Sequence, residues 1–209
     1  MRYFIKPPWW LKKLYRACIW DIPAKEKVLY LTFDDGPHPQ ATAFVLDELK
    51  KYNAKATFFC IGKNVTLHSP IYRRILDEGH RVGNHTFNHL NGWKTKDITY
   101  FKDVAAAAKH IDSSLFRPPY GKASRWQIKH LTGAGPFNMK VIMWSVLSAD
   151  FDPEVSPEDC LQNVILAAKP GDIIVFHDSE KAWRNLAYAL PKVLMYFTGR
   201  GYRFEKINL

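Results

Sequence analysis

Two adjacent carboxylates end an apolar, β-branched run near the start of the chain. In the segment LYLTFDDGPHP, Asp34 and Asp35 follow Phe33 directly and precede Gly36 and a proline. Side chains of a regular strand alternate between its two faces, so these neighbours can converge only where the strand gives way to a loop. Two carboxylates held together repel unless a cation joins them. The pair therefore predicts a divalent metal, ligated by one acid while the other acts on water; an ordinary Asp-Gly-Pro turn is the alternative.

Two histidines four residues apart could complete such a metal site. His85 and His89 begin and end the segment HTFNH. Imidazoles at this spacing can share one face of a single turn and chelate a metal, although a chance pair is the alternative in a chain with eight histidines. Two histidines and one aspartate leave a coordination position for water, whose pKa a metal lowers to about 7. The chemistry that this donor set predicts is hydrolysis.

Two further clusters supply groups that hydrolysis would need. In the segment RPPYG, a fixed guanidinium of Arg117 near Asp34 would hold that acid ionised, and the backbone N–H of Tyr120 is a candidate oxyanion donor. His177 ends a strongly apolar run, and Asp150 could raise its pKa so that it protonates a leaving amine. A rigid surface loop and a buried structural histidine are the alternatives, and Asp178 is expected to serve the turn.

Short apolar runs alternate with segments of helical spacing between these clusters. The predicted strands are residues 28–33, 56–61, 81–83, 140–146, 172–176 and 203–207, with a further candidate around Phe116. The predicted helices are residues 42–52, 70–78, 98–113, 124–131, 156–168 and 183–198. This alternation predicts an α/β fold with a parallel sheet, and a barrel and an open doubly wound sheet both satisfy it. Each polar cluster follows a predicted strand, where ligand chemistry gathers in both architectures.

Composition limits the class of protein further. The 209 residues suit one domain, with 30 Lys and Arg against 20 Asp and Glu and a net charge of +10. Nucleic acid, anionic polymers and acidic membranes attract such a charge, but it is scattered, so a nucleic-acid partner is not expected. Three dispersed cysteines argue against a disulfide framework.

The first 25 residues form a basic, aromatic segment in front of the domain at residues 26–209. Lysines and an arginine interrupt its apolar residues, so it is neither a clear signal peptide nor a membrane span. Residues 1–20 could form an interfacial helix that contacts an anionic membrane, or a helix that packs its aromatics on the domain, which we favour. We expect a monomer located in the cytoplasm or peripherally at a membrane face.

Taken together, the clusters resemble the polysaccharide deacetylase family, carbohydrate esterase family 4, with its NodB-homology domain. Five motifs stand in the family's order across residues 28–207: TFDDG, HTFNH, RPPYG, the segment that ends in Asp150 and Phe151, and VFHDS. The resemblance implies a distorted, seven-stranded (β/α) barrel. It also implies metal-dependent hydrolysis of an N-acyl group on an amino sugar, usually N-acetylglucosamine, with release of acetate.

The resemblance assigns roles position by position. Asp34 is implied to be the base and His177 the acid, and Arg117 and Asp150 are implied to tune them. The implied metal ligands are Asp35, His85 and His89, and the metal is zinc, with cobalt, nickel or manganese as alternatives. The residues implied to contact the substrate are Pro119, Tyr120, Phe151 and Val175, and Tyr120 also contributes its amide to the oxyanion hole.

The chain departs from the family pattern at the substrate wall. Phe151 replaces the usual tryptophan and lacks its indole N–H donor, Val175 replaces the usual leucine, and Leu147 stands where many relatives have an acid. These changes place the choice of substrate in question. A lipid-linked sugar or a small amide are therefore alternative substrates, and a catalytically silent carbohydrate-binding module is an alternative function.

Overall fold

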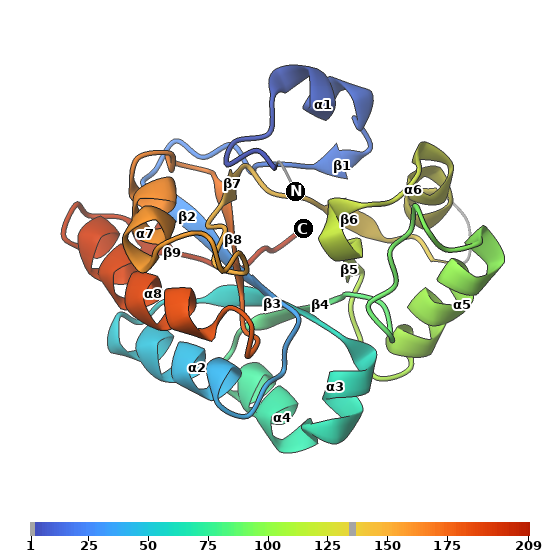
Figure 1. Cartoon of the computed structure of the whole chain (residues 1–209), viewed down its shortest axis with the longest axis horizontal. Helices are drawn as coiled ribbons and strands as arrows, with labels where there is room; N and C mark the ends of the chain where they lie inside the picture. Colours follow the sequence, from blue (N-terminus) through green and yellow to red (C-terminus); the bar gives the residue numbers. More distant parts are fainter. Residues whose placement is uncertain (1–2, 134–136) are drawn as a thin grey trace.

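A curled, parallel β-sheet forms the centre of the molecule, and helices surround it (Figure 1). The computed structural model describes residues 3–133 and 137–209. Its strands are β1 (Cys18–Ile19), β2 (Val28–Asp34), β3 (Ala56–Cys60), β4 (Arg81–Asn84), β5 (Leu115–Phe116), β6 (Lys140–Ile142), β7 (Val146–Leu147), β8 (Ile173–His177) and β9 (Arg203–Phe204). Its helices are α1 (Trp9–Leu14), α2 (Ala41–Lys51), α3 (Gly62–Leu67), α4 (Ser69–Asp77), α5 (Asp97–Ala108), α6 (Arg125–Thr132), α7 (Pro157–Ile165) and α8 (Trp183–Thr198), with a 3₁₀ turn at Pro119–Gly121.

The order of the strands explains how the sheet curls. The order is β1-β6-β5-β4-β3-β2-β8-β7, with β9 paired to β2, and these ladders are all parallel. β6 lies next to β1 at one end of this path and β7 lies at the other end, yet only residues 143–145 separate β6 from β7 along the chain. The chain thus links the two ends of the sheet covalently. The expected distorted barrel is confirmed, but the sheet has nine strands within the described residues instead of seven.

The prediction of a single strand over residues 140–146 is wrong. Lys140–Ile142 pairs with β5 and β1, whereas Val146–Leu147 pairs with β8. Between them, the N–H of Met143 donates to Ile19 O and that of Ser145 to Ile173 O. One extended run thus changes its partner strand midway, and pattern alone cannot show this because both halves are apolar. The strand β1, which was not predicted, accounts for the rest of the difference in number, whereas β9 occupies the first two residues of the strand predicted over residues 203–207.

The other predicted elements agree closely with the structure. The strands near residues 28, 56, 81 and 172 are present with shifts of one residue at their ends, and Ser156 caps α7 by accepting from the N–H of Asp159. The helix predicted over residues 98–113 ends earlier, at Ala108, and α3 was not predicted. The three cysteines are free and buried.

Helices cover the outer face of the sheet, so most strands are apolar on both faces. Phe33 of β2 stacks on Phe58 of β3, with ring centroids 5.1 Å apart, and lies 6.2 Å from the ring of Phe176 in β8. These rings belong to the core that α2, α7 and α8 cover. This packing fixes three neighbouring strands in register, and with them the residues at their carboxyl ends.

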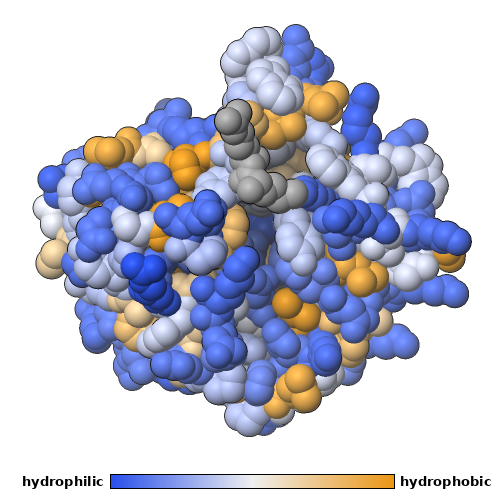
Figure 2. Space-filling model, in the orientation of Figure 1, coloured by the Kyte–Doolittle hydropathy of each residue, from blue (hydrophilic) through white to orange (hydrophobic). Residues whose placement is uncertain are grey.

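The N-terminal segment is joined to the sheet but is only partly buried. Cys18 and Trp20 are buried beside β6, whereas α1 buries none of its residues and Trp9 remains 74% exposed. Helix α1 stands away from the body of the molecule (Figures 1 and 2). The segment therefore packs on the domain through β1 and the residues around it, but not through the tryptophans of α1. Within the described residues, none of the helices combines the length and hydrophobicity that a membrane span requires.

Candidate active site

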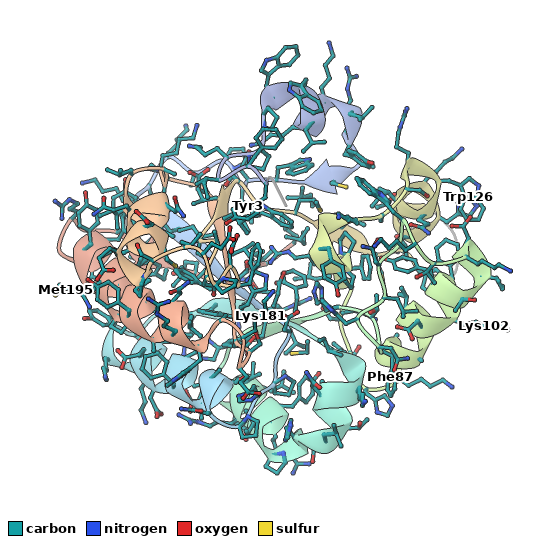
Figure 3. The ribbon with its side chains drawn as sticks, in the orientation of Figure 1. Tyr3, Phe87, Lys102, Trp126, Lys181 and Met195 are labelled. Atoms are coloured by element: carbon teal, nitrogen blue, oxygen red, sulfur yellow. The ribbon has the colours of Figure 1, made fainter. Side chains whose placement is uncertain are left out.

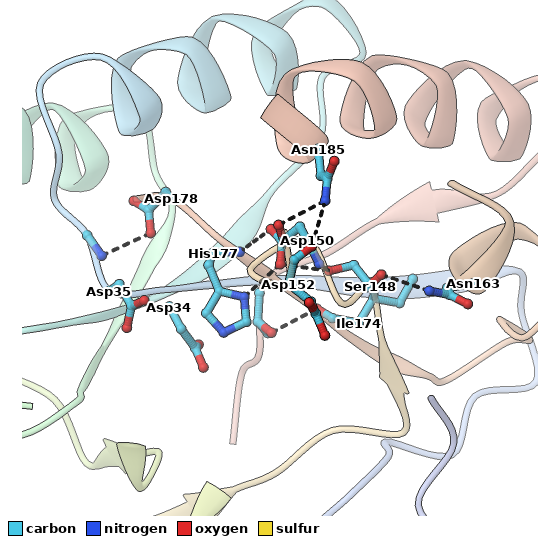
Figure 4. A network of polar contacts seen from close by, with 12 residues as sticks. Asp34, Asp35, Ser148, Asp150, Asp152, Asn163, Ile174, His177, Asp178 and Asn185 are labelled. Carbon is cyan, nitrogen blue, oxygen red and sulfur yellow. Dashed lines mark hydrogen bonds and ion pairs between the residues drawn. The ribbon is translucent and has the colours of Figure 1, made fainter. Parts of the chain in front are cut away.

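The predicted polar residues meet where the strands end. Asp34 is the last residue of β2 and lies in register with His177, the last residue of β8. His85 follows β4, Arg117 follows β5, and Asp150 lies in the loop after β7. In Figure 4 the ring of His177 lies between the carboxylates of the β2 end and Asp150. Carboxyl ends of parallel strands share one edge of a sheet, which is why residues distant in sequence converge here.

Asp34 forms an ion pair with a fully buried arginine. The Nη1 atom of Arg117 donates to Asp34 Oδ1 at 2.7 Å and to Thr32 Oγ1 at 2.8 Å. Its Nε and Nη2 atoms donate to the carbonyls of Ile142 and Met143 at 3.1 and 2.8 Å. The guanidinium is therefore fixed on every side, and it forms a charge-assisted hydrogen bond with the Asp34 carboxylate.

Asp35, His85 and His89 offer three ligand atoms within 4.8 Å of one another. Asp35 Oδ1 lies 3.7 Å from His85 Nε2 and 3.1 Å from His89 Nε2. This oxygen is buried and accepts no well-formed hydrogen bond from any described residue, despite the short distance to His89. A buried acceptor atom that faces two imidazole nitrogens without forming a hydrogen bond to either fits a divalent cation.

The protonation of these groups agrees with ligation. His85 Nδ1 lies 2.7 Å from Arg117 O, so that nitrogen carries the proton and Nε2 keeps its lone pair for a metal. Burial lowers the pKa of His85 to about 4, so the ring is neutral at pH 7. Burial alone would raise the pKa of Asp35, but His89, His177 and His85 outweigh this and hold the pKa below its usual range.

Left-handed backbone brings the ligands together. Asp35, Thr86 and His89 have φ angles of 82°, 62° and 57°, which non-glycine residues seldom adopt. The two histidines therefore converge through an irregular loop and not on one face of a helical turn. Asp103 of α5 holds this loop by accepting from the N–H groups of Phe87 and Asn88 at 2.8 and 2.9 Å.

Sequence reasoning missed three residues that hold the site loops. Asp103 supports the histidine loop, Asn64 of α3 donates to Asp35 O at 2.7 Å, and Asn185 of α8 donates to Asp150 O at 3.2 Å. Each is a short polar residue that is wholly or mostly buried on the helix side of the site. A polar residue in a helix is ordinarily solvated, so a single sequence carries no signal for them.

His177 is paired with Asp150 as expected. The Nδ1 atom of His177 lies 2.8 Å from Asp150 Oδ1, and its backbone N–H donates to Asp150 Oδ2 at 2.7 Å. Burial lowers the pKa of His177, but the charge and hydrogen bond of Asp150, together with Asp35 and Asp34, raise it to about 9. The imidazole is therefore protonated at neutral pH and has a proton to donate through Nε2.

The remaining predicted residues line the space around this pair. Tyr120 has a φ of 61°, its ring lies 4.6 Å from that of His89, and its backbone N–H donates to no acceptor in the described part of the chain. Pro119 is buried beside it. Phe151 packs edge-on to His177 at 5.0 Å, and Val175 shares the face of β8 with His177 and is buried.

Asp178 belongs to the turn, as expected. Its carboxylate accepts from Gly36 N at 3.0 Å and from the Thr42 hydroxyl, and so ties the loop after Asp35 to α2 (Figure 4). A Cβ atom on Gly36 would lie 2.0 Å from this carboxylate, which explains the glycine after the two acids.

Comparison with known proteins agrees with this geometry. Residues 21–135 match the family model for polysaccharide deacetylase. The chain belongs to the polysaccharide deacetylase family. A peptidoglycan-N-acetylglucosamine deacetylase of Bacillus cereus is 35% identical over 90% of both chains, and a chitooligosaccharide deacetylase of Azorhizobium caulinodans is 32% identical over 75% of this chain and 76% of its own.

A solved structure places this fold in the same family. It is that of a peptidoglycan N-acetylglucosamine deacetylase in complex with 4-naphthalen-1-yl-N-oxidanyl-benzamide, with a TM-score of 0.85 and 31% identity over 96% of this chain and 95% of the other. The expectation of a family of hydrolases that act on amide bonds of polysaccharides is confirmed.

Replacing one imidazole tests the metal site. We expect His85→Ala to lose bound zinc, because it removes one of three ligand atoms from the cluster. Metal content after dialysis against buffered zinc, measured by inductively coupled plasma mass spectrometry, gives the result. His110→Ala, which removes an exposed imidazole outside the cluster, is the control. Equal zinc content in both variants would show that the three residues do not hold a metal.

The pH dependence tests the histidine–aspartate pair. Since the pKa of His177 is raised to about 9, a reaction that needs its proton stays active at neutral pH and declines as the pH rises through that value. Asp150→Asn should move this alkaline limb of kcat down by about 1 to 3 pH units, because it removes the charge that stabilises the imidazolium. The exposed Glu154→Gln should leave the limb in place. An unmoved limb in Asp150→Asn would exclude His177 as the titrating acid.

Proposed function

We propose that this chain is a metal-dependent hydrolase that removes N-acetyl groups from an amino-sugar polymer or oligomer of the N-acetylglucosamine type. The observation that carries the proposal is the unpaired, buried oxygen of Asp35 between His85 and His89, with the Asp34 carboxylate, paired with Arg117, beside it. The names of the relatives, which include peptidoglycan and chitooligosaccharide deacetylases, support an acetylated amino sugar as the substrate class.

Each residue of the proposed site has its own role, beginning with the metal ligands and the base. Asp35, His85 and His89 would hold the metal, with zinc favoured over cobalt, nickel and manganese for a site of two histidines and one aspartate. Such a metal lowers the pKa of water and polarises the acyl carbonyl. Asp34, held in place by Arg117, accepts the proton of the attacking water.

The other groups serve the acyl transfer itself. The N–H of Tyr120 points from a left-handed residue beside His89 and donates to the oxyanion that forms at the carbonyl. His177 gives its proton to the leaving nitrogen and so completes the cleavage. Phe151 and Val175 form the apolar wall beside the acid, and Pro119 stiffens the loop that carries Tyr120.

Acetate release from defined substrates tests this function. We expect the zinc-loaded protein to release acetate from chitooligosaccharides or peptidoglycan fragments, and a chelator to abolish the release. Asp34→Asn should lower the rate at least about 100-fold, because a general base contributes 10²–10⁴ to such reactions, while zinc content stays unchanged. Release only from lipid-linked sugars or small amides would favour those substrates, and binding without release would indicate a silent carbohydrate-binding module.

We also propose that the deacetylase acts peripherally at an anionic membrane face. A groove of about 810 Å³ lies between α1 and α6 and is lined by cations and aromatics but no acidic residue. Its exposed cations are Lys13, Arg16, Arg125 and Lys129. None of them forms an ion pair within the described residues. The exposed rings of Trp10 and Trp126 at the same groove favour a membrane interface over a purely polar partner.

The expected monomeric state of the protein stays a prediction.

Vesicle binding tests this placement. The protein should sediment with phosphatidylglycerol vesicles but not with phosphatidylcholine vesicles. Glutamine at all four groove cations should weaken binding at least about tenfold, because each cation near an anionic surface contributes about 1 kcal/mol. The control carries four exposed lysines changed to glutamine elsewhere, at Lys50, Lys63, Lys102 and Lys109. Equal weakening in both sets, or salt-sensitive binding to DNA instead of vesicles, would contradict the proposal.

A further inference from the structure

Residues 3–5, the first that the structure describes, lie along the loop that carries Asp150, the partner of the proposed acid His177. The carbonyl of Ile5 accepts from the N–H of Leu147 at 2.9 Å, and the phenol of Tyr3 donates to Asp152 Oδ2 at 2.8 Å. Residues 3–5 are therefore tied to both ends of the segment 147–152. Burial and Asp152 raise the pKa of Tyr3, so its phenol keeps the proton that it donates.

These anchors place an aromatic ring against the wall of the active site. The ring of Tyr3 meets that of Phe151 edge-on at 5.4 Å, and Phe151 meets the ring of His177 edge-on at 5.0 Å. The Nζ atom of Lys181 lies 5.7 Å from the centre of the Phe151 ring. Figure 3 shows Tyr3 between α1 and the middle of the molecule, with Lys181 below it. A residue from the N-terminus thus reaches the proton donor through one intervening side chain.

The place of Phe151 relates it to the acyl group of the substrate. His177 protonates the nitrogen that carries the acyl group, so the acyl carbons lie within a few bond lengths of the imidazole. Phe151 and Val175 are the apolar side chains placed beside that imidazole. The ring position of Phe151 therefore sets how much room an acyl chain finds.

Phe151 needs a partner to keep that position. It lies in a loop, is partly exposed, and makes ring contacts only with Tyr3 and His177 among the described aromatic residues. A ring on a loop has several staggered rotamers, and packing selects among them. Without the ring of Tyr3, Phe151 can turn away from His177 and open the space beside the acid.

We propose that Tyr3 is a specificity-determining positioning residue, which holds Phe151 against His177 and so restricts the site to a short acyl group. The inference rests on the proposed function, because it places the acyl group beside the acid. It adds to that function a role for the N-terminal segment in substrate choice.

The selectivity between acyl lengths tests the proposal. kcat/KM is measured for chitotetraose with N-acetyl groups and for the same oligosaccharide with N-butyryl groups. We expect Tyr3→Ala to raise the butyryl-to-acetyl ratio at least about tenfold, because one or two methylenes in an apolar pocket are worth this much discrimination. Tyr3→Phe, which keeps the ring and loses the hydrogen bond to Asp152, should cause a smaller rise.

Two controls separate positioning from general damage. Phe4→Ala disturbs the same segment at its contact with Trp10, 6.5 Å between rings, and should leave the ratio unchanged. In a Phe151→Ala background, Tyr3→Ala should produce no further change in the ratio, because Tyr3 acts through that ring. An unchanged ratio in Tyr3→Ala, or an equal rise in Phe4→Ala, would overturn the proposal.

A binding measurement tests the same selectivity without requiring turnover, and a second variant replaces Tyr3→Ala if that variant does not fold. Calorimetry with the zinc-loaded protein compares acetohydroxamate with butyrohydroxamate, and the same shift toward the longer chain is expected in Tyr3→Ala. If wild-type protein hydrolyses neither oligosaccharide, the proposed function fails, while the hydroxamate ratio still decides the role of Tyr3. If Tyr3→Ala does not fold, as judged by circular dichroism, the ratio in Tyr3→Phe decides: no rise would refute the positioning role.

Discussion

A single buried guanidinium holds the active site together. Arg117 is completely inaccessible to solvent, and a buried charge is tolerated only when partners surround it. Its donors reach Asp34 and Thr32 on β2, the carbonyl of Ile142 in β6 and that of the adjacent Met143, and its Cζ atom lies 4.1 Å from the centre of the Phe59 ring. A lysine could not make this set of contacts, because its single ammonium lacks the planar fork of an arginine.

The same residue couples the proposed base to the proposed metal site. The carbonyl of Arg117 accepts from His85 Nδ1, while its side chain fixes Asp34, so one residue orients a proposed ligand and the proposed base together. Its side chain also joins β2 to Ile142 of β6 and to the adjacent Met143. The link between these strands, the position of Asp34 and the tautomer of His85 therefore depend on one set of hydrogen bonds.

Strain in the backbone gathers around this centre. Five non-glycine residues with positive φ lie in the loops after the strands: Asp35, Thr86, His89, Tyr120 and Ala149. Such conformations cost on the order of 1 kcal/mol or more each and persist only where surrounding contacts fix them. Asn64 and Asp103 provide contacts of this kind from the helix side. The helices thus stabilise the fold and also hold the ligand loops in shapes that the loops would not adopt alone.

The sequence by itself determined which residue types stand at the strand ends. Apolar strands alternate with helices, and polar clusters follow the strands, and both of these patterns are local. Asp34, His85 and His177 could be identified in this way, and the structure brings them to one edge of the sheet. Only the tertiary structure decided how the run at residues 140–147 divides between two partner strands, and that Asn64, Asp103 and Tyr3 support the site. These features arise from contacts between segments far apart in the chain, and such contacts depend on how the sheet curls and not on the local order of residues.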